Sequence, residues 1–184
     1  MNDFYFGMKD FEYPMGNIQM VGKSQAPMYR GEKPIEAGLA PMFVLDEVAK
    51  HAVDFWLSTE DLPMPDNRIT LEQDGSIKLS YTLNNQVAKQ KLYDKLKSML
   101  NHLGMHPNHL IPRNLYMKNE IDVGGVAHQA GTARFGKDPK TSVLDVDCKA
   151  HELDNLYIVD TSFFPSIGAV NPALTAMANA LRVG

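Results

Sequence analysis

A turn between two alternating segments constrains the fold of this chain more than any other feature. Residues 67–72 and 76–82 alternate polar and apolar side chains with a period of two, as half-buried strands do. The residues between them, 73–75, include the pair Asp74-Gly75, which supplies the positive φ angles of a tight hairpin turn. We therefore predict a β-hairpin and, with it, an antiparallel sheet.

Two other segments predict strands, and the stretch between them predicts a loop. Residues 17–21 alternate polar and apolar side chains, which indicates a short strand. Residues 52–59 are expected to form a third strand beside the hairpin. Residues 23–41 show little periodicity and predict a long loop. We expect it to act as a lid or binding loop rather than a linker, because side chains such as Tyr29 and Arg30 offer contacts.

The clearest helical pattern lies between residues 84 and 104. Its apolar side chains recur at spacings of three and four: Ala88, Leu92, Leu96, Met99, Leu100 and Leu103. Asn84 or Asn85 is expected to cap its start, and Gly104 its end. The lysines on its other side predict a solvated face rather than a binding patch.

Composition excludes several classes of protein. The chain has 184 residues, 44% of them hydrophobic and 22% charged, which fits one compact domain or two small lobes. Its net charge is −4 and it has no basic stripe, which excludes a nucleic-acid binder. No apolar run approaches the roughly 20 residues that cross a bilayer. Cys148 is the only cysteine, which excludes an intrachain disulfide and a cysteine-based zinc site.

Three histidines after the predicted helix raise the question of a metal site. His102, His106 and His109 would have to converge on one point to bind a metal ion. Pro107 breaks any helical register between the second and third, and no carboxylate lies among them. We therefore expect no metal site.

The last sixty residues contain the candidate chemistry. His128 lies among small residues such as Gly125 and Gly131, which allow a backbone to approach a flat, bulky group within reach of the imidazole. Taken alone, a histidine in such a stretch is more often a structural hydrogen-bonding group. Residues 155–160 predict a buried strand that ends in the acid Asp160.

A helix is predicted over residues 173–181, with Asn171 as its N-cap and Pro172 at its first position. The N-terminus of a helix carries free N–H groups and partial positive charge, so it can stabilise an anionic group of a ligand. The same pattern also fits a well-capped terminal helix with no ligand, and the pattern alone does not separate the two.

Four ordered segments of this region resemble the C-terminal signature of the glucose–methanol–choline (GMC) oxidoreductases. They are residues 128–132 (HQAGT), 142–145 (SVLD), 155–165 (NLYIVDTSFFP) and 171–175 (NPALT). Their order and spacing are far more specific than any one of them. The segment from Leu62-Pro63 to Asn67-Arg68 is also similar to the family's substrate domain. The resemblance is closest to the bacterial branch that acts on sugars and other polyols.

The resemblance implies an α+β fold in two parts. Residues 1–122 would belong to the substrate-binding domain, an antiparallel sheet with packed helices. Residues 123–184 would supply the catalytic segment and the C-terminal strand and helix of the FAD-binding domain.

The resemblance also implies flavin chemistry on an alcohol or sugar. His128 would accept the hydroxyl proton while the hydride passes to flavin N5, and Asn171 would hydrogen-bond the substrate oxygen. Asp160 and Thr161 would hold FAD, and Asn171 would also contact it. The amide of Ala173 would face the pyrimidine end of the flavin, since Pro172 has no N–H to offer.

One departure from the family pattern affects this expectation. The Gly-x-Gly-x-x-Gly turn that binds the ADP part of FAD occurs nowhere in the chain. The chain is therefore expected to be the C-terminal part of the enzyme, without its N-terminal FAD-binding half, and to be inactive alone. It would be a truncated gene product, a fragment, or one half that another chain completes. A non-catalytic remnant or interaction module is the alternative. A hydrolase built on His128, Ser162 and Asp160 is disfavoured, because no Gly-x-Ser-x-Gly segment is present.

Overall fold

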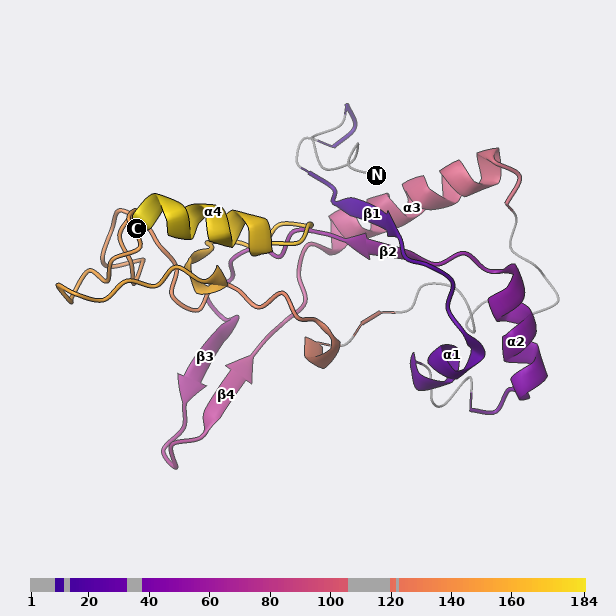
Figure 1. Ribbon diagram of the computed structural model, residues 1–184, viewed down its shortest axis with the longest axis horizontal. Coiled ribbons are helices and arrows are strands. Elements are labelled where there is room, and N and C mark those ends of the chain that lie inside the picture. Colours follow the sequence, from indigo (N-terminus) through magenta and orange to yellow (C-terminus); the bar gives the residue numbers. More distant parts are fainter. Residues whose placement is uncertain (1–8, 12–13, 33–37, 106–119, 122) are drawn as a thin grey trace.

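The computed structural model describes residues 9–11, 14–32, 38–105, 120–121 and 123–184. Within them the chain forms β1 (Asn17–Met20), α1 (Ala26–Glu32), α2 (Met42–His51), β2 (Phe55–Ser58), β3 (Arg68–Leu71), β4 (Ile77–Ser80), α3 (Gln86–His102), the 3-10 turns η2 (Val123–Gly125) and η3 (Thr161–Phe163), and α4 (Ala173–Val183). The predicted α+β class is confirmed: four α-helices accompany two antiparallel two-stranded sheets in the described residues. Along the long axis of Figure 1, α1 and α2 lie at one end and α4 with the C-terminal coil at the other, with β1 and β2 between them; α3 runs from the strands toward the end that holds α1 and α2.

Strands β1 and β2 pair with each other, with Ile18 opposite Leu57. Both strands were predicted, but the expected partner of β2 was wrong, because β2 does not join the hairpin. The chain between β2 and β3 contains Pro63 and Pro65, which have no N–H to donate to a ladder. Before them, the backbone of Asp61 pairs with a segment near the C-terminus instead.

Helix α3 packs on this small sheet and completes the central core cluster, which consists of Met15, Ile18, Leu92 and Leu96. Gly104 ends the helix as predicted: its φ is +79°, its N–H donates to Asn101, and the Met105 N–H donates to Leu100, as in a Schellman motif. The predicted asparagine cap is only half right. Asn85 is the N-cap residue, but its side chain makes no capping hydrogen bond. Its amide donates to the Glu60 carbonyl at 2.9 Å instead.

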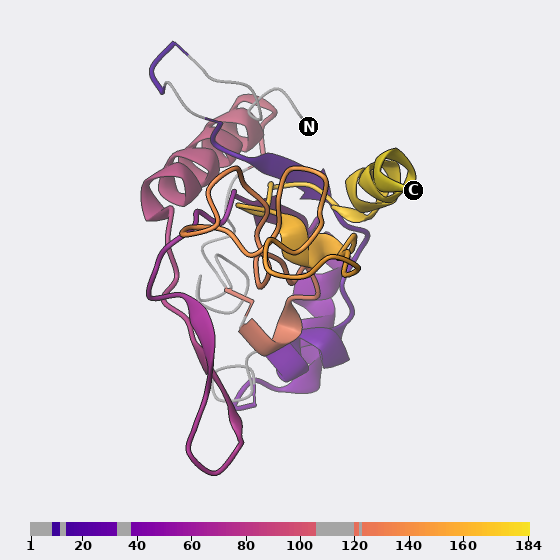
Figure 2. The same cartoon turned by 90° about the vertical axis from the view of Figure 1, so that its left-hand side faces the viewer.

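The predicted hairpin is confirmed, with Ile69 opposite Leu79 and Leu71 opposite Ile77. The turn differs in one detail from the prediction, since only Gly75, with φ +82°, adopts a positive φ among its residues. The Glu72 N–H donates to the Ser76 carbonyl at 2.9 Å and the Gly75 N–H donates to the Glu72 carbonyl at 3.0 Å, so the loop has the three predicted residues, 73–75. Figures 1 and 2 show the hairpin projecting away from the rest of the molecule.

The stretch 23–41 is not a continuous loop, which corrects the prediction for this region. Its residues 26–32 form α1, and α2 follows at Met42. Tyr29 of α1 packs in a buried cluster with Leu45 and Val48 of α2. The helix thus depends on tertiary contacts that its short, weakly periodic sequence does not reveal.

The C-terminal coil has its own core, in which Leu144, Cys148, Ala150 and Phe163 are buried. The buried strand predicted over residues 155–160 is wrong: this segment forms a single bridge, Lys149 to Tyr157, and the Tyr157 side chain is exposed. The partner segment turns back at Asp145 and places Cys148 in the left-handed region at φ +61°, so a longer ladder cannot form. The terminal helix α4 is confirmed.

Among the described residues, no helix combines the length and the apolar character needed to cross a membrane.

A substitution at Gly16, directly before β1, tests the close approach of this segment to β2. Its φ is +144°, and a Cβ there would lie 2.1 Å from the Ser58 carbonyl oxygen. We expect Gly16→Ala to destabilise the protein by about 2 kcal/mol or more, through backbone strain and overpacking. Gly22, where a Cβ would meet nothing within 4 Å, provides the matched control Gly22→Ala. Chemical unfolding of both variants checks this, and equal stabilities would contradict it.

Candidate active site

The segment that carries His128 lies along η3. Thr161 Oγ1 donates to the Gln129 carbonyl at 2.7 Å. The Ala133 N–H donates to Ser162 at 3.1 Å, and the Phe135 N–H donates to Phe163 at 3.1 Å. These three bonds hold residues 129–135 against the residues that follow Asp160. His128, immediately before them, has an exposed side chain.

Gly131 adopts a backbone conformation that favours glycine in the segment after His128. Its φ is +83°, a region that side-chain-bearing residues rarely adopt, whereas a Cβ there would lie at an ordinary contact distance of 3.4 Å from the Phe164 carbonyl oxygen. This glycine thus has a structural use in the backbone of the segment.

Asp160 caps η3 with its side chain. Its Oδ1 accepts the Ser162 N–H at 2.8 Å and also the Ser162 hydroxyl. These hydrogen bonds, first from the side chain and then from the backbone of Ser162, hold the pKa of Asp160 below its usual value of 3.8. Asp160 is therefore a carboxylate at neutral pH, and its Oδ2 has no hydrogen bond within the described residues.

The charge of Asp160 contributes to stability in a defined pH window. Because the pKa of Asp160 is lower in the folded than in the unfolded chain, its contribution is full above about pH 3.8 and is lost as the pH falls through the folded pKa. We expect Asp160→Asn, which keeps an acceptor, to lower stability at pH 7 by about 0.5 kcal/mol, since an exposed charge is screened. Unfolding at pH 7 and pH 3 measures this; a difference that persists undiminished at pH 3 would contradict it.

Asn171 lies just before α4, and its role as N-cap is not confirmed. The helix begins at Ala173 and its N-cap is Pro172, which has helical dihedral angles and accepts the Ala176 N–H at 3.0 Å. The Asn171 side chain is exposed and has no hydrogen bond within the described residues. The predicted boundary was one residue too early, because proline adopts the helical φ before the first hydrogen-bonded turn.

The other end of α4 is fixed to the coil by Arg182. Its guanidinium donates to Asp147 Oδ1 at 3.0 Å, to the Val146 carbonyl at 2.7 Å, and to Asn179 Oδ1 at 3.0 Å. Ala173, the first residue of the helix, is exposed. The helix is thus held at its C-terminus and presents its N-terminal residue to the surroundings.

The structure tests the hydrolase and metal hypotheses within the described residues. Ser162 donates to Asp160, and no hydrogen bond joins Ser162 to His128. One serine–histidine pair does exist: Ser142 Oγ lies 3.1 Å from His151 Nε2. The same Nε2 lies 3.2 Å from the Gly136 carbonyl oxygen, so it carries a proton and cannot accept another from Ser142.

Among the described residues, no group of three or more His, Cys, Asp or Glu side chains could hold a metal ion. His102 ends α3, and His106 and His109 lie outside the described residues.

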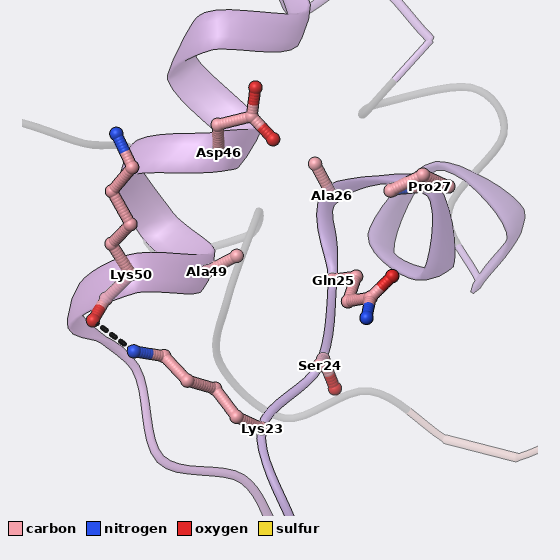
Figure 3. A pocket seen from close by; sticks show the side chains of 8 residues that line it. All are labelled: Lys23, Ser24, Gln25, Ala26, Pro27, Asp46, Ala49 and Lys50. Carbon is pink, nitrogen blue, oxygen red and sulfur yellow. Dashed lines mark hydrogen bonds between the residues drawn. The ribbon is translucent and has the colours of Figure 1, made fainter.

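An open pocket of about 390 Å³ lies at the opposite end of the molecule, between the start of α1 and one face of α2. Figure 3 shows its lining, in which Lys23 donates a hydrogen bond to the Lys50 carbonyl and Asp46 faces the same space. None of the predicted site residues lines this pocket.

The structure therefore brings together two of the segments that carry predicted site residues. The backbone next to His128 is bonded to the segment of Asp160 and Thr161. No hydrogen bond links His128 to Asn171 within the described residues, so the pairing of these two side chains stays a prediction.

Comparison with known proteins identifies the class of this domain. Residues 63–180 match the C-terminal family model described as GMC oxidoreductase, which is well over half of the chain. The chain belongs to the GMC oxidoreductase family, and it corresponds to the family's C-terminal domain. This family is FAD-dependent.

Individual relatives match over different lengths. The chain is 52% identical over 58 residues (32% of this chain, 11% of the relative) to 6'''-hydroxyparomomycin C oxidase of Streptomyces lividus. It is 31% identical over 150 residues (77% of this chain, 26% of the relative) to paromamine 6'-oxidase of Streptomyces fradiae. It is 28% identical over 169 residues (83% of this chain, 28% of the relative) to the large subunit of fructose dehydrogenase of Gluconobacter japonicus. The chain thus spans between about a tenth and somewhat over a quarter of these proteins.

Proposed function

We propose that this chain forms the substrate-side and catalytic part of an FAD-dependent oxidoreductase acting on the CH–OH group of an alcohol or sugar. The observation that carries the proposal is the 2.7 Å hydrogen bond from Thr161 to the Gln129 carbonyl. It holds the exposed His128 beside the segment of Asp160, where the family resemblance expects the cofactor. The names of the relatives, which include paromamine 6'-oxidase and fructose dehydrogenase, favour a sugar or a sugar-derived alcohol as the substrate class.

The residues at this edge fit a large, partly anionic cofactor. Thr161 uses its hydroxyl proton on Gln129, so its oxygen remains available as an acceptor for a ligand N–H or O–H. Asp160 offers the second oxygen of an ionised carboxylate, which suits a ligand hydroxyl. Ala173 is exposed at the start of an 11-residue helix, where a free N–H and partial positive charge suit negative charge on a cofactor. We assign these three residues to FAD.

The reaction is a hydride and proton removal. FAD, when bound, supplies the acceptor for the hydride that leaves the alcohol carbon. Loss of hydride builds positive charge on that carbon, and withdrawal of the hydroxyl proton offsets this charge. His128 accepts that proton, for which a neutral imidazole near pH 7 is suited, and the alcohol becomes a carbonyl.

Asn171 orients the substrate, and the N-terminus of α4 stabilises negative charge on the cofactor. The Asn171 amide donates a hydrogen bond to the substrate oxygen and so orients the hydroxyl toward His128. The N-terminus of α4 places fixed positive potential near the cofactor, a preorganised stabiliser for the negative charge that reduction brings.

We further propose that the activity needs an FAD-binding part that these 184 residues do not supply. The ADP-binding Gly-x-Gly-x-x-Gly turn does not occur in this sequence. We expect the 184 residues alone to bind no stoichiometric flavin and to reduce no dye with polyols.

Co-expression with a separate FAD-binding half of a GMC oxidoreductase tests the proposal. We expect flavin absorbance to copurify with this chain and polyols to support dye reduction. The His128→Ala variant is the matched control, which should retain flavin and lose reduction. Co-purification without flavin would favour the non-catalytic module instead. Stoichiometric flavin on the isolated chain would refute the need for a second part.

A further inference from the structure

A polar contact outside the proposed site joins the two parts of the chain. The Asp61 N–H donates to the Ile167 carbonyl at 2.9 Å, and the Ile167 N–H donates back to Asp61 at 3.3 Å. Beside this bridge, Ser166 Oγ donates to Glu60 Oε1 at 2.5 Å. The distance is typical of a strong hydrogen bond from a hydroxyl to a carboxylate. Two segments 106 residues apart in sequence are thus fixed to each other.

The segment of Glu60 and Asp61 is itself held firmly by the start of α3. Asn85 Nδ2 donates to the Glu60 carbonyl at 2.9 Å. Asn84 forms a reciprocal pair with Leu62, accepting its N–H at 3.1 Å and donating to its carbonyl at 2.9 Å. Because α3 is anchored by its buried leucines, the segment is a fixed support rather than a free loop.

The Asp61 side chain adds to this support. Its Oδ2 lies 3.5 Å from the Tyr81 hydroxyl, and burial together with the Asp61 charge raises the pKa of Tyr81. Its Oδ1 is fully buried with no hydrogen bond in the described part of the chain. Burial of an unpaired oxygen is unfavourable, so the Asp61 side chain lowers the stability of this contact in part.

On the other side of the contact lies the loop 164–172, which connects η3 to α4. It starts at Phe164, whose ring stacks on buried Phe163 at 4.5 Å, and Ala169 is buried farther along. Ser166 and Ile167 lie between these anchors. Asn171 follows four residues after Ile167, so the Glu60 contact limits the positions that Asn171 can take.

We propose that Glu60 is a positioning residue for the reaction: through Ser166 it fixes the loop 164–172 and thereby places the Asn171 amide against the substrate oxygen. This inference rests on the proposed function, which gives Asn171 its role. A hydrogen-bonding group displaced by about 1 Å can lose up to roughly 10²-fold in rate, so a loosened loop affects the chemical step rather than substrate binding.

The test uses this chain in its flavin-loaded complex with an FAD-binding half, with two readouts: hydrogen exchange of residues 164–172 and rapid flavin reduction by substrate. We expect Glu60→Ala and Ser166→Ala each to raise exchange in this loop and to slow reduction by roughly 10–100-fold, with KM little changed. Glu60→Gln keeps an acceptor for Ser166 and should restore most of the loss. The double variant should be no slower than either single one, since both changes break one bond.

Glu72, an exposed acid on the hairpin loop, provides the matched control Glu72→Ala, which should change neither readout. Unchanged exchange in Glu60→Ala would overturn the contact. Raised exchange with an unchanged reduction rate would overturn the positioning role, provided that Asn171→Ala itself slows reduction. If Asn171→Ala has no effect on the rate, the proposed function of Asn171 fails and the positioning role with it, whereas the exchange readout still reports on the contact.

Discussion

Replacing His128 with alanine is expected to slow flavin reduction by roughly 10²–10⁴-fold, the range that a general base contributes. The imidazole is exposed and lies next to the Gln129–Thr161 hydrogen bond, so its loss removes the proton acceptor without breaking the local backbone. We expect flavin content and the free energy of unfolding to stay unchanged. Rapid mixing of flavin-loaded protein with saturating substrate measures the chemical step directly.

His51 supplies the matched control for this prediction. It is an exposed histidine at the end of α2, where its side chain contacts Glu47 at the surface. The variant His51→Ala should reduce flavin at the wild-type rate. Wild-type reduction kinetics in His128→Ala, with substrate bound, would remove His128 from the mechanism.

Asn171→Ala is expected to slow reduction by roughly 10²-fold while stability changes by less than about 0.5 kcal/mol. The sequence predicted Asn171 as the N-cap of this helix, and with that role the substitution would also lower stability. In the structure Pro172 is the N-cap and the Asn171 side chain makes no hydrogen bond within the described residues. The two readouts are therefore separable, and stopped-flow reduction with thermal unfolding measures them on the same sample.

A double variant sharpens the Asn171 prediction. If both side chains act on one substrate hydroxyl, His128→Ala combined with Asn171→Ala should lose less than the product of the two single effects. Independent action at separate places would give additive free energies. A stability loss near 1 kcal/mol in Asn171→Ala would instead restore the capping role.

Local patterns predicted those elements that local chemistry determines. The hairpin and α3 follow from alternation, from helical periodicity and from glycines at Gly75 and Gly104, both of which have positive φ. Helix α1 could not be predicted in the same way, since it depends on Tyr29 packing against α2. The pairing of β2 also depends on distant contacts, because Asp61 is engaged by Ile167 at the other end of the chain.

The candidate site was predicted mainly from resemblance, and the structure provides contacts for the segment of Asp160 and Thr161 within it. Thr161 donates a hydrogen bond to Gln129 in the His128 segment, and Asp160 accepts hydrogen bonds from Ser162 beside it, which spacing alone did not indicate. The contact between Glu60 and Ser166 was missed, because a side-chain bond across 106 residues leaves no local pattern. The sequence offered one signal for it, an acidic pair directly before Leu62-Pro63 at the start of the family-like segment.

The central claim is that one imidazole and one carboxamide, 43 residues apart by their numbers 128 and 171, serve the same substrate oxygen. A crystal structure of the flavin-loaded protein with an unreactive alcohol analogue tests it most directly. We predict an imidazole nitrogen of His128 and the amide nitrogen of Asn171 within about 3.2 Å of the analogue's hydroxyl oxygen. An analogue bound at the flavin with either side chain turned away into solvent would contradict the account.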